Sequence, residues 1–135
     1  MIGACLDAGF EGEVFLVNPN YNEIESRLCY NSLKDLPRAV EHTVLMVANA
    51  RLEQVLTEAI EVGARAATIF ASGYLDDGRP IPLWQRLQRM ARDAGIVVCG
   101  GNGSGFYNRE AKVRCQMWGG EPEEPGPVTL ISQSG

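Results

Sequence analysis

The sequence predicts an α/β fold in which a doubly wound, mainly parallel sheet carries helices on both faces and is truncated at both ends. Three observations support this prediction: four β-rich apolar runs, two amphipathic helical stripes between them, and a glycine just after each expected helix. Strands that alternate with helices are typical of a parallel sheet, because each helix forms the crossover to the next strand.

The four expected strands are nearly continuous in apolar character, which is typical of parallel strands that are covered on both faces. They are Glu13 to Val17, Thr43 to Val47, Ala66 to Phe70 and Ile96 to Cys99. Between the first two, residues 29–36 predict no more than a short strand and one helical turn. At 135 residues the chain has the length of about one domain.

Two helices are predicted by apolar residues at helical spacing. The stripes are Leu52, Val55, Leu56, Ala59 and Ile60, and then Leu83, Trp84, Leu87, Met90, Ala91 and Ala94. The second stripe predicts that Trp84 packs in the core. Gly9, Gly63 and Gly95 predict helix-to-strand turns, since glycine is favoured just past a helix end. Met1 to Ala8 would then be the last turns of a further helix.

Composition excludes several classes of function. The net charge is −5 and no cluster of Lys and Arg occurs, which argues against binding to a nucleic-acid backbone. No apolar run approaches the ~20 residues that cross a bilayer. The four cysteines form no C-x-x-C pair and His42 is the only histidine, so we expect free thiols, no metal site and a reducing cytoplasm. His42 is expected to be a solvated loop residue, and Cys99 to pack as a small hydrophobe.

Each expected strand ends in a patch of small or polar residues. The four patches are residues 17–20, 47–50, 70–73 and 99–105. Ligands of open parallel sheets bind outside the carboxyl ends of the strands, so these patches predict a binding edge. Four glycines among residues 100–105 strengthen the prediction, because glycine carries an entropy cost that a plain connection does not require. Asn49 is expected to cap the helix that starts near Arg51 and so to keep N–H groups aimed at an anion.

Five segments in order resemble the CoA-binding domain of NDP-forming acyl-CoA synthetases, which are relatives of the succinyl-CoA synthetase α subunit. The segments are Val-Asn-Pro-Asn-Tyr at 17–21, Cys-Tyr-Asn-Ser-Leu at 29–33, Phe-Ala-Ser-Gly-Tyr at 70–74, Gly-Asn-Gly-Ser-Gly-Phe-Tyr-Asn at 101–108 and Ile-Ser-Gln-Ser-Gly at 131–135. The resemblance covers the chain from about Met1 to Gly135. It implies a Rossmann-like domain with CoA lying along the strand ends.

The resemblance also assigns each patch a part of CoA. It places Asn18, Pro19, Asn20 and Tyr21 at the adenosine and phosphate end, and Ala48, Asn49 and Ala50 at the middle. It places Ser72, Gly73 and Tyr74 at the pantetheine approach, and Asn102, Gly103 and Ser104 near the thiol. Ser134 and Gly135 match the loop that faces a phosphohistidine of the next domain. The sequence departs from the family at Asn20, where Lys is frequent, at Asn49, where Pro is common, and at Gly101 and Gly103, where Pro and Cys are common.

The implied function is the CoA-binding portion of an enzyme that makes acyl-CoA from acid, CoA and a nucleoside triphosphate, through an acyl phosphate and a phosphohistidine. CoA is a substrate, whereas ATP or GTP and Mg²⁺ belong to the parent enzyme. No catalytic residue is expected in this chain, so the fragment alone would be inactive. The expected partners are downstream ligase and ATP-grasp domains, fused or on another subunit, and an oligomer is possible.

The implied domain limits are 1–118 for the CoA-binding domain, 119–126 for a linker rich in Pro, Gly and Glu, and 127–135 for the first strand of a ligase-like domain. The first, central strand and its Gly-rich phosphate loop would be missing. The strands Glu13 to Val17 and Thr43 to Val47 would then lack the neighbour between them, which predicts a weakly stable or partner-dependent fragment.

Two other functions stay open. One is a stand-alone CoA-binding or regulatory protein without catalysis, against which the linker and the following strand argue. The other is a fragment of an NAD(P)-dependent dehydrogenase. Binding of NAD calls for an acidic residue after the second strand, where this chain has Asn18 and Pro19, so NAD is disfavoured while NADP is not excluded.

Overall fold

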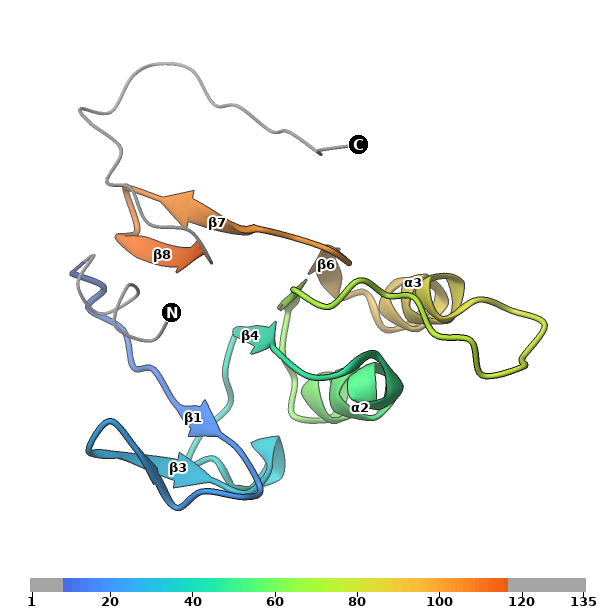
Figure 1. Ribbon diagram of the computed structural model, residues 1–135. Coiled ribbons are helices and arrows are strands. Elements are labelled where there is room, and N and C mark those ends of the chain that lie inside the picture. Colours follow the sequence, from blue (N-terminus) through green and yellow to red (C-terminus); the bar gives the residue numbers. More distant parts are fainter. Residues whose placement is uncertain (1–8, 117–135) are drawn as a thin grey trace. The chain divides into compact units, whose positions relative to one another are not determined.

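Figure 1 shows the computed structural model of the chain, which describes residues 9–116. These residues divide into two compact units, and each is described by itself. The larger unit is residues 11–105, and the smaller one contains residues 9–10 and 106–116 of the described chain.

Over residues 9–116, no helix combines the length and the apolar character that crossing a membrane requires.

The larger unit contains two three-stranded sheets. In the first, β1 (Leu16–Val17) pairs in parallel with β3 (Arg27–Tyr30), which pairs on its other edge with the antiparallel β2 (Glu23–Ile24). A single turn of 3-10 helix, η1 (Leu33–Asp35), follows. Sequence analysis did not predict β2, while the short strand and the single turn are confirmed.

The second sheet is parallel throughout and has the order β4-β5-β6. Its strands are β4 (His42–Leu45), β5 (Ala66–Ile69) and β6 (Val97–Cys99). A 3-10 turn, η2 (Asn49–Arg51), and α2 (Leu52–Glu61) connect β4 to β5, and α3 (Leu83–Ala94) connects β5 to β6. The alternation of strand and helix that the sequence predicted is confirmed. Within the described residues no ladder joins β1 to β4, so the strands form two sheets.

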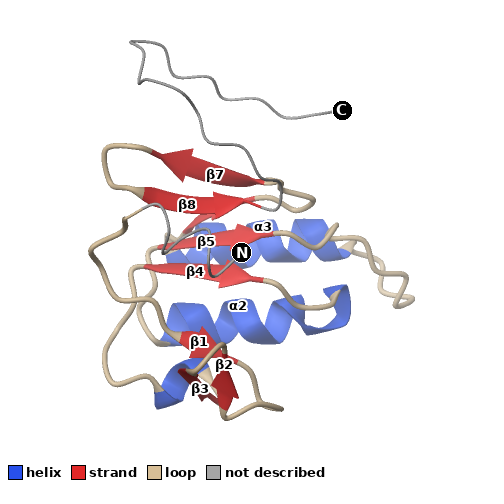
Figure 2. Ribbon diagram, turned by 60° about the vertical axis from the view of Figure 1, so that its left-hand side comes forward, coloured by secondary structure: helices blue, strands red, loops and turns tan. Residues whose placement is uncertain are grey.

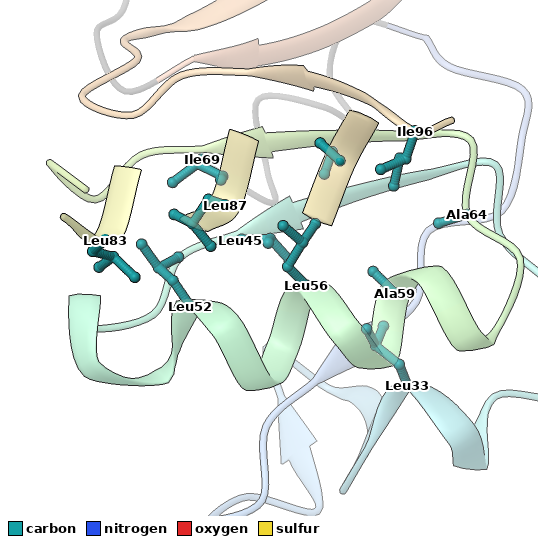
Figure 3. Close-up of a cluster of buried hydrophobic side chains, with 12 residues drawn as sticks. Leu33, Leu45, Leu52, Leu56, Ala59, Ala64, Ile69, Leu83, Leu87 and Ile96 are labelled. Carbon is teal, nitrogen blue, oxygen red and sulfur yellow. The ribbon is translucent and has the colours of Figure 1, made fainter. Parts of the chain in front are cut away.

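Both described helices lie on one face of the β4-β5-β6 sheet (Figure 2). Leu52 and Leu56 of α2 and Leu83 of α3 are almost completely buried, and they meet Leu45 and Ile69 from the sheet (Figure 3). This contact explains the predicted stripe of α2, whose Val55 and Ile60 also pack against the core. The further helix expected at Met1 to Ala8 lies outside the described residues, as do the linker 119–126 and the strand 127–135.

The opposite face of this sheet is mixed, because His42 and the buried Thr68 lie on it together with exposed apolar side chains. Val44 and Met46 extend from β4 and its end, and Val97 projects from β6 with 70% of its surface exposed. Cys99, which was expected to pack as a small hydrophobe, is also exposed, because it lies on the same face as Val97 two residues earlier.

The second helical stripe is partly wrong. Leu83, Leu87 and Ala91 are buried as expected, but Trp84 is 46% exposed and Ala94 is exposed. Trp84 follows Leu83 by one position, about 100° around the helix, and so lies beside the buried row instead of in it.

Glycine turns connect the helices to the next strands as predicted. Gly95 ends α3 with φ of 69°, and Gly63 follows α2 with φ of 83°. Both angles are left-handed, where a side chain is disfavoured. Gly9 also has a left-handed φ, of 78°. The smaller unit holds β7 (Gly105–Asn108), which begins at the unit boundary, and β8 (Val113–Gln116), which form a two-stranded sheet that the sequence analysis did not predict.

Candidate functional site

The second and third strand-end patches are joined by one side chain. Asn49 follows β4, and its Nδ2 donates a hydrogen bond to Oγ of Ser72 at 3.0 Å. Its Oδ1 accepts a hydrogen bond from the backbone N–H of Gly73, also at 3.0 Å. Both partners lie just after β5. We call Asn49, Ser72 and Gly73 the Asn49 clasp, since they fasten the ends of two neighbouring strands together.

The clasp corrects the expected role of Asn49. The residues at the N-terminal ends of η2 and α2 are Ala48 and Arg51, and neither makes a side-chain capping bond. The Asn49 amide instead bonds to Ser72 through its nitrogen and to Gly73 through its oxygen, and both partners lie more than 20 residues later in the chain.

The Ser72 hydroxyl is left with a proton to donate. Its oxygen accepts hydrogen bonds from Asn49 and from the backbone N–H of Tyr74 at 3.2 Å. A hydroxyl oxygen has two lone pairs and carries one donor hydrogen. Both lone pairs are therefore engaged, while Ser72 is exposed. The site thus presents a fixed O–H donor toward solvent at the end of β5.

The glycine-rich fourth patch packs directly on the end of β5. The backbone N–H of Asn102 donates to the Ala71 carbonyl at 2.7 Å, and that of Gly103 donates to the Ile69 carbonyl at 3.3 Å. A Cβ atom at Gly101 would stand 2.8 Å from the carbonyl oxygens of Ala71 and Ser72, which is too close. The glycines therefore allow two stretches of backbone to meet, and they place the fourth patch beside the Asn49 clasp.

The first patch is a separate turn at the end of β1. The backbone N–H of Asn20 donates to Oδ1 of Asn18 at 2.9 Å, and Asn18 N–H donates to the Tyr30 carbonyl at 2.8 Å. Pro19 and Tyr21 complete the turn and are exposed. Over residues 9–116, no hydrogen bond of this turn reaches the other three patches. The structure thus brings together three of the four predicted patches by direct contact.

The remaining predicted site residues flank these contacts. Ala48 and Ala50 are exposed on either side of Asn49, and the Ala48 carbonyl accepts the Arg51 N–H at 2.9 Å. Tyr74 and Ser104 are exposed at the third and fourth patches. Ser134 and Gly135 lie outside the described residues.

An ionic cluster beside the third patch was missed by the sequence analysis. Its members, which we call the Arg86 cluster, are Glu53, Asp77, Arg79 and Arg86. Hydrogen bonding to Glu53 raises the pKa of Arg86, and Asp77 adds to the effect although partial burial opposes it. Burial alone would raise the pKa of Asp77, but hydrogen bonds from Arg86 and the Arg79 backbone, with both positive charges, bring it below its usual range. The two carboxylates that bind Arg86 lie 9 and 33 residues from it in the sequence, so no local pattern predicts these bonds.

His42 is not the solvated loop residue that was expected. It is the first residue of β4 and half-buried, and its Nε2 lies 2.9 Å from Oγ1 of Thr68. Burial lowers its pKa, because desolvation disfavours the imidazolium. Within residues 9–116, no group of His, Cys, Asp or Glu is placed to hold a metal ion.

The sequence matches the CoA binding domain family over residues 1–109. The chain belongs to this family. The resemblance drawn from five segments of the sequence is confirmed, and so is the Rossmann-like α/β fold class.

Curated relatives and solved structures agree with this assignment. Acetate–CoA ligase [ADP-forming] II of Archaeoglobus fulgidus is 31% identical over 128 residues, which are 94% of this chain and 19% of the relative. The α subunit of acetate–CoA ligase [ADP-forming] I of Pyrococcus furiosus is 31% identical over 137 residues, which are 96% of this chain and 29% of the subunit. The chain therefore spans about a fifth to three tenths of the length of these relatives.

Among solved structures, a dinucleotide-forming acetyl-coenzyme A synthetase 1 of Ca. Korarchaeum cryptofilum, in complex with phosphate and ADP, superposes with a TM-score of 0.76 at 25% identity, over 85% of this chain and 25% of that one. A conserved hypothetical protein from Pyrococcus furiosus superposes with a TM-score of 0.58 at 31% identity, over 73% of this chain and 75% of that one.

Proposed function

We propose that this chain is the CoA-binding portion of an NDP-forming acyl-CoA synthetase and that CoA lies along the ends of β4, β5 and β6. The observation that carries the proposal is the match to the CoA binding domain family, together with ADP-forming ligases among the relatives. The contacts of the Asn49 clasp and of the glycine-rich patch support it, because they assemble a rigid, largely uncharged surface at the edge where parallel sheets bind ligands.

The clasp suits the amide-rich pantetheine arm of CoA. The Ser72 proton is the free donor of the clasp, so it would be directed to a carbonyl or phosphate oxygen of the ligand. The exposed residues Tyr74 and Ser104 would border the same arm. Asn102 and Gly103 would lie near the thiol, and the turn of Asn18 to Tyr21 would take the adenosine and phosphate end.

Isothermal titration of the 135-residue chain with CoA, NAD and NADP tests the proposal. We expect binding of CoA and not of the two nicotinamide dinucleotides. Ser72→Ala is expected to weaken CoA binding about tenfold, since one hydrogen bond to a charged or buried acceptor contributes roughly 1.5 kcal/mol. Asn49→Ala should weaken it to a similar extent, because it removes the bonds that hold Ser72 and Gly73 in place. Gln88→Ala, which removes an exposed amide on α3, is the matched control and should bind as the wild type does. Binding of NADP but not of CoA would instead favour the hypothesis that the chain is a fragment of an NAD(P)-dependent dehydrogenase.

Catalysis would need the rest of the parent enzyme. We propose that the chain forms no thioester by itself, because the phosphohistidine and the site for ATP or GTP with Mg²⁺ belong to the downstream ligase and ATP-grasp parts. Ser134 and Gly135 would form the loop that faces the phosphohistidine, after a linker at 119–126. An assay of acetyl-CoA formation from acetate, CoA, ATP and Mg²⁺ tests this, and turnover by the purified chain would refute it.

A stand-alone CoA-binding protein is the second candidate. The observation that favours it is the Pyrococcus furiosus protein, three quarters of which this chain matches. The sequence of the gene upstream of Met1 and downstream of Gly135 separates the two candidates. A continuous reading frame that enters a ligase domain supports the first proposal, and a stop codon shortly after residue 135, with no ligase subunit encoded beside it, supports the second.

A further inference from the structure

The Arg86 side chain donates hydrogen bonds to three residues. Its Nε and Nη2 donate to the two carboxylate oxygens of Glu53 at 2.9 and 3.1 Å. Nη2 also donates to Asp77 at 2.7 Å, and Nη1 donates to the backbone carbonyl of Ile81 at 2.5 Å. The Arg86 side chain is only 11% exposed, while its bond to Asp77 lies at the surface.

These contacts join three segments of the chain. Glu53 lies in the first turn of α2, Arg86 lies on α3, and Asp77 and Ile81 belong to the loop from β5 to α3. Arg79 strengthens the same link, because its guanidinium bonds to Glu53 at 3.0 Å and approaches Asp77 at 3.3 Å. The loop is thus bound to both helices around one guanidinium.

The same loop carries half of the Asn49 clasp. Near its start it contains Ser72 and Gly73, which bond to Asn49, and Asn49 lies just before α2. At its other end the loop is bound to Glu53, in the first turn of α2. The loop is therefore fastened to the start of α2 at two places, by neutral hydrogen bonds at the strand end and by charges farther along.

We propose that Arg86 is a positioning residue for the strand-end site: it holds the loop of residues 74–82 against α2 and so keeps Ser72 and Gly73 in register with Asn49. This inference rests on the proposed binding of CoA. The fold of α3 does not depend on these bonds, since Leu83, Leu87 and Ala91 bury its apolar face and Gly95 ends it. Loss of the guanidinium should release the loop and leave both helices packed.

Four variants of the 135-residue chain test the role. Arg86→Met keeps the length of the side chain and removes its charge and donors, and Arg86→Lys keeps the charge with a single donor group. Arg89→Met is the matched control, because Arg89 is exposed on the same helix. In Glu53→Gln/Arg86→Met the carboxylate that loses its bonds to Arg86 and keeps only the one to Arg79 is also neutralised, which separates lost positioning from uncompensated charge.

Two readouts are taken at a temperature where every variant is folded by circular dichroism. One is the dissociation constant for CoA by titration calorimetry, and the other is hydrogen exchange of the backbone amides between Gly73 and Ile81. We expect Arg86→Met to weaken CoA binding at least tenfold and to accelerate exchange in this segment at least tenfold, while the amides of β4 and β5 keep their protection. Arg86→Lys should recover part of both effects, and Arg89→Met should change neither.

The double variant decides between the two explanations. If Arg86 positions the loop, Glu53→Gln/Arg86→Met recovers stability but not CoA affinity; recovery of full affinity would overturn the proposal. Unchanged CoA affinity in Arg86→Met would overturn it as well. If Arg86→Met does not fold, Asp77→Asn is measured instead, because it removes one carboxylate charge from the cluster and leaves Glu53 in place. We expect CoA to bind this variant about threefold more weakly. Unchanged CoA binding would refute the role of Arg86. If the wild-type chain does not bind CoA, the proposed function fails, whereas the exchange data still report whether Arg86 holds the loop.

Discussion

Replacing Gly100 by alanine tests whether the glycine-rich patch is shaped by close backbone contact. A Cβ atom at this position would overlap sterically with the Ile69 carbonyl oxygen and would stand 3.1 Å from the carbonyl carbon of Ile69. The backbone of Gly100 also has φ of 110°, which side chains rarely adopt. The substitution therefore adds a steric clash to a conformational penalty.

The magnitude follows from the bonds that the clash would break. If the loop moves away from β5, the hydrogen bonds from Asn102 to Ala71 and from Gly103 to Ile69 are lost. At about 1 kcal/mol net for each bond this is roughly 2 kcal/mol. The conformational penalty adds about 1 to 3 kcal/mol. We expect Gly100→Ala to lower the free energy of unfolding by about 3 to 5 kcal/mol.

Gly78→Ala is the control, because Gly78 has a left-handed φ of 70° and no atom within 4 Å of the Cβ position. It should lose only the conformational part, about 1 to 2 kcal/mol. Urea unfolding of both variants, followed by circular dichroism, gives the difference. Surface substitutions without a special contact usually change the free energy of unfolding by no more than about 0.5 kcal/mol. If the free energies of unfolding of the two variants differ by less than this, close packing of Gly100 on Ile69 is refuted.

Three further predictions concern the core, the pH dependence and the site. Leu56→Ala should lower stability by about 2 to 5 kcal/mol in the same assay, because Leu56 is completely buried between helix and sheet; a loss below 1 kcal/mol would contradict that packing. Burial lowers the pKa of His42 from 6.5, so the unfolded chain binds its proton more tightly, and stability should fall as the pH drops below about 6.5. His42→Gln should flatten this part of the profile of stability against pH. An unchanged profile would show that His42 is not the group responsible. In a Trp118→Phe background, which leaves Trp84 as the one tryptophan of the sequence, CoA should change the fluorescence of Trp84, because its Cβ stands 3.7 Å from the Cβ position of Gly73. No change at saturating CoA would refute the proximity of Trp84 to the binding site.

Local patterns predicted the elements that local forces determine. The α2 stripe was found because Leu52, Leu56 and Ala59 recur on one side of a helix, and burial of that side is what the core requires. The turn at Gly95 was found for a similar reason, since a left-handed φ at a helix end strongly favours glycine.

Contacts between distant residues account for what was not predicted. The Asn49 amide was expected to bind its own helix, but its partners arrive from β5, more than 20 residues later. Nothing in the local sequence around Arg86 predicts its ionic partners, because Glu53 and Asp77 converge on it from other segments. The strand-end patches were predictable because topology alone brings the ends of parallel strands to one edge.

The exposed apolar side chains at β4 and β6 have a consequence for how the chain behaves in concentrated solution. Met46 and Val97 present apolar surface to water, and the net charge of −5 at pH 7 keeps neighbouring molecules apart. Acidification removes that repulsion while leaving the apolar surface unchanged. Turbidity should therefore increase with protein concentration as the pH falls, and added sodium chloride should lower the concentration at which it begins, because salt screens the charge.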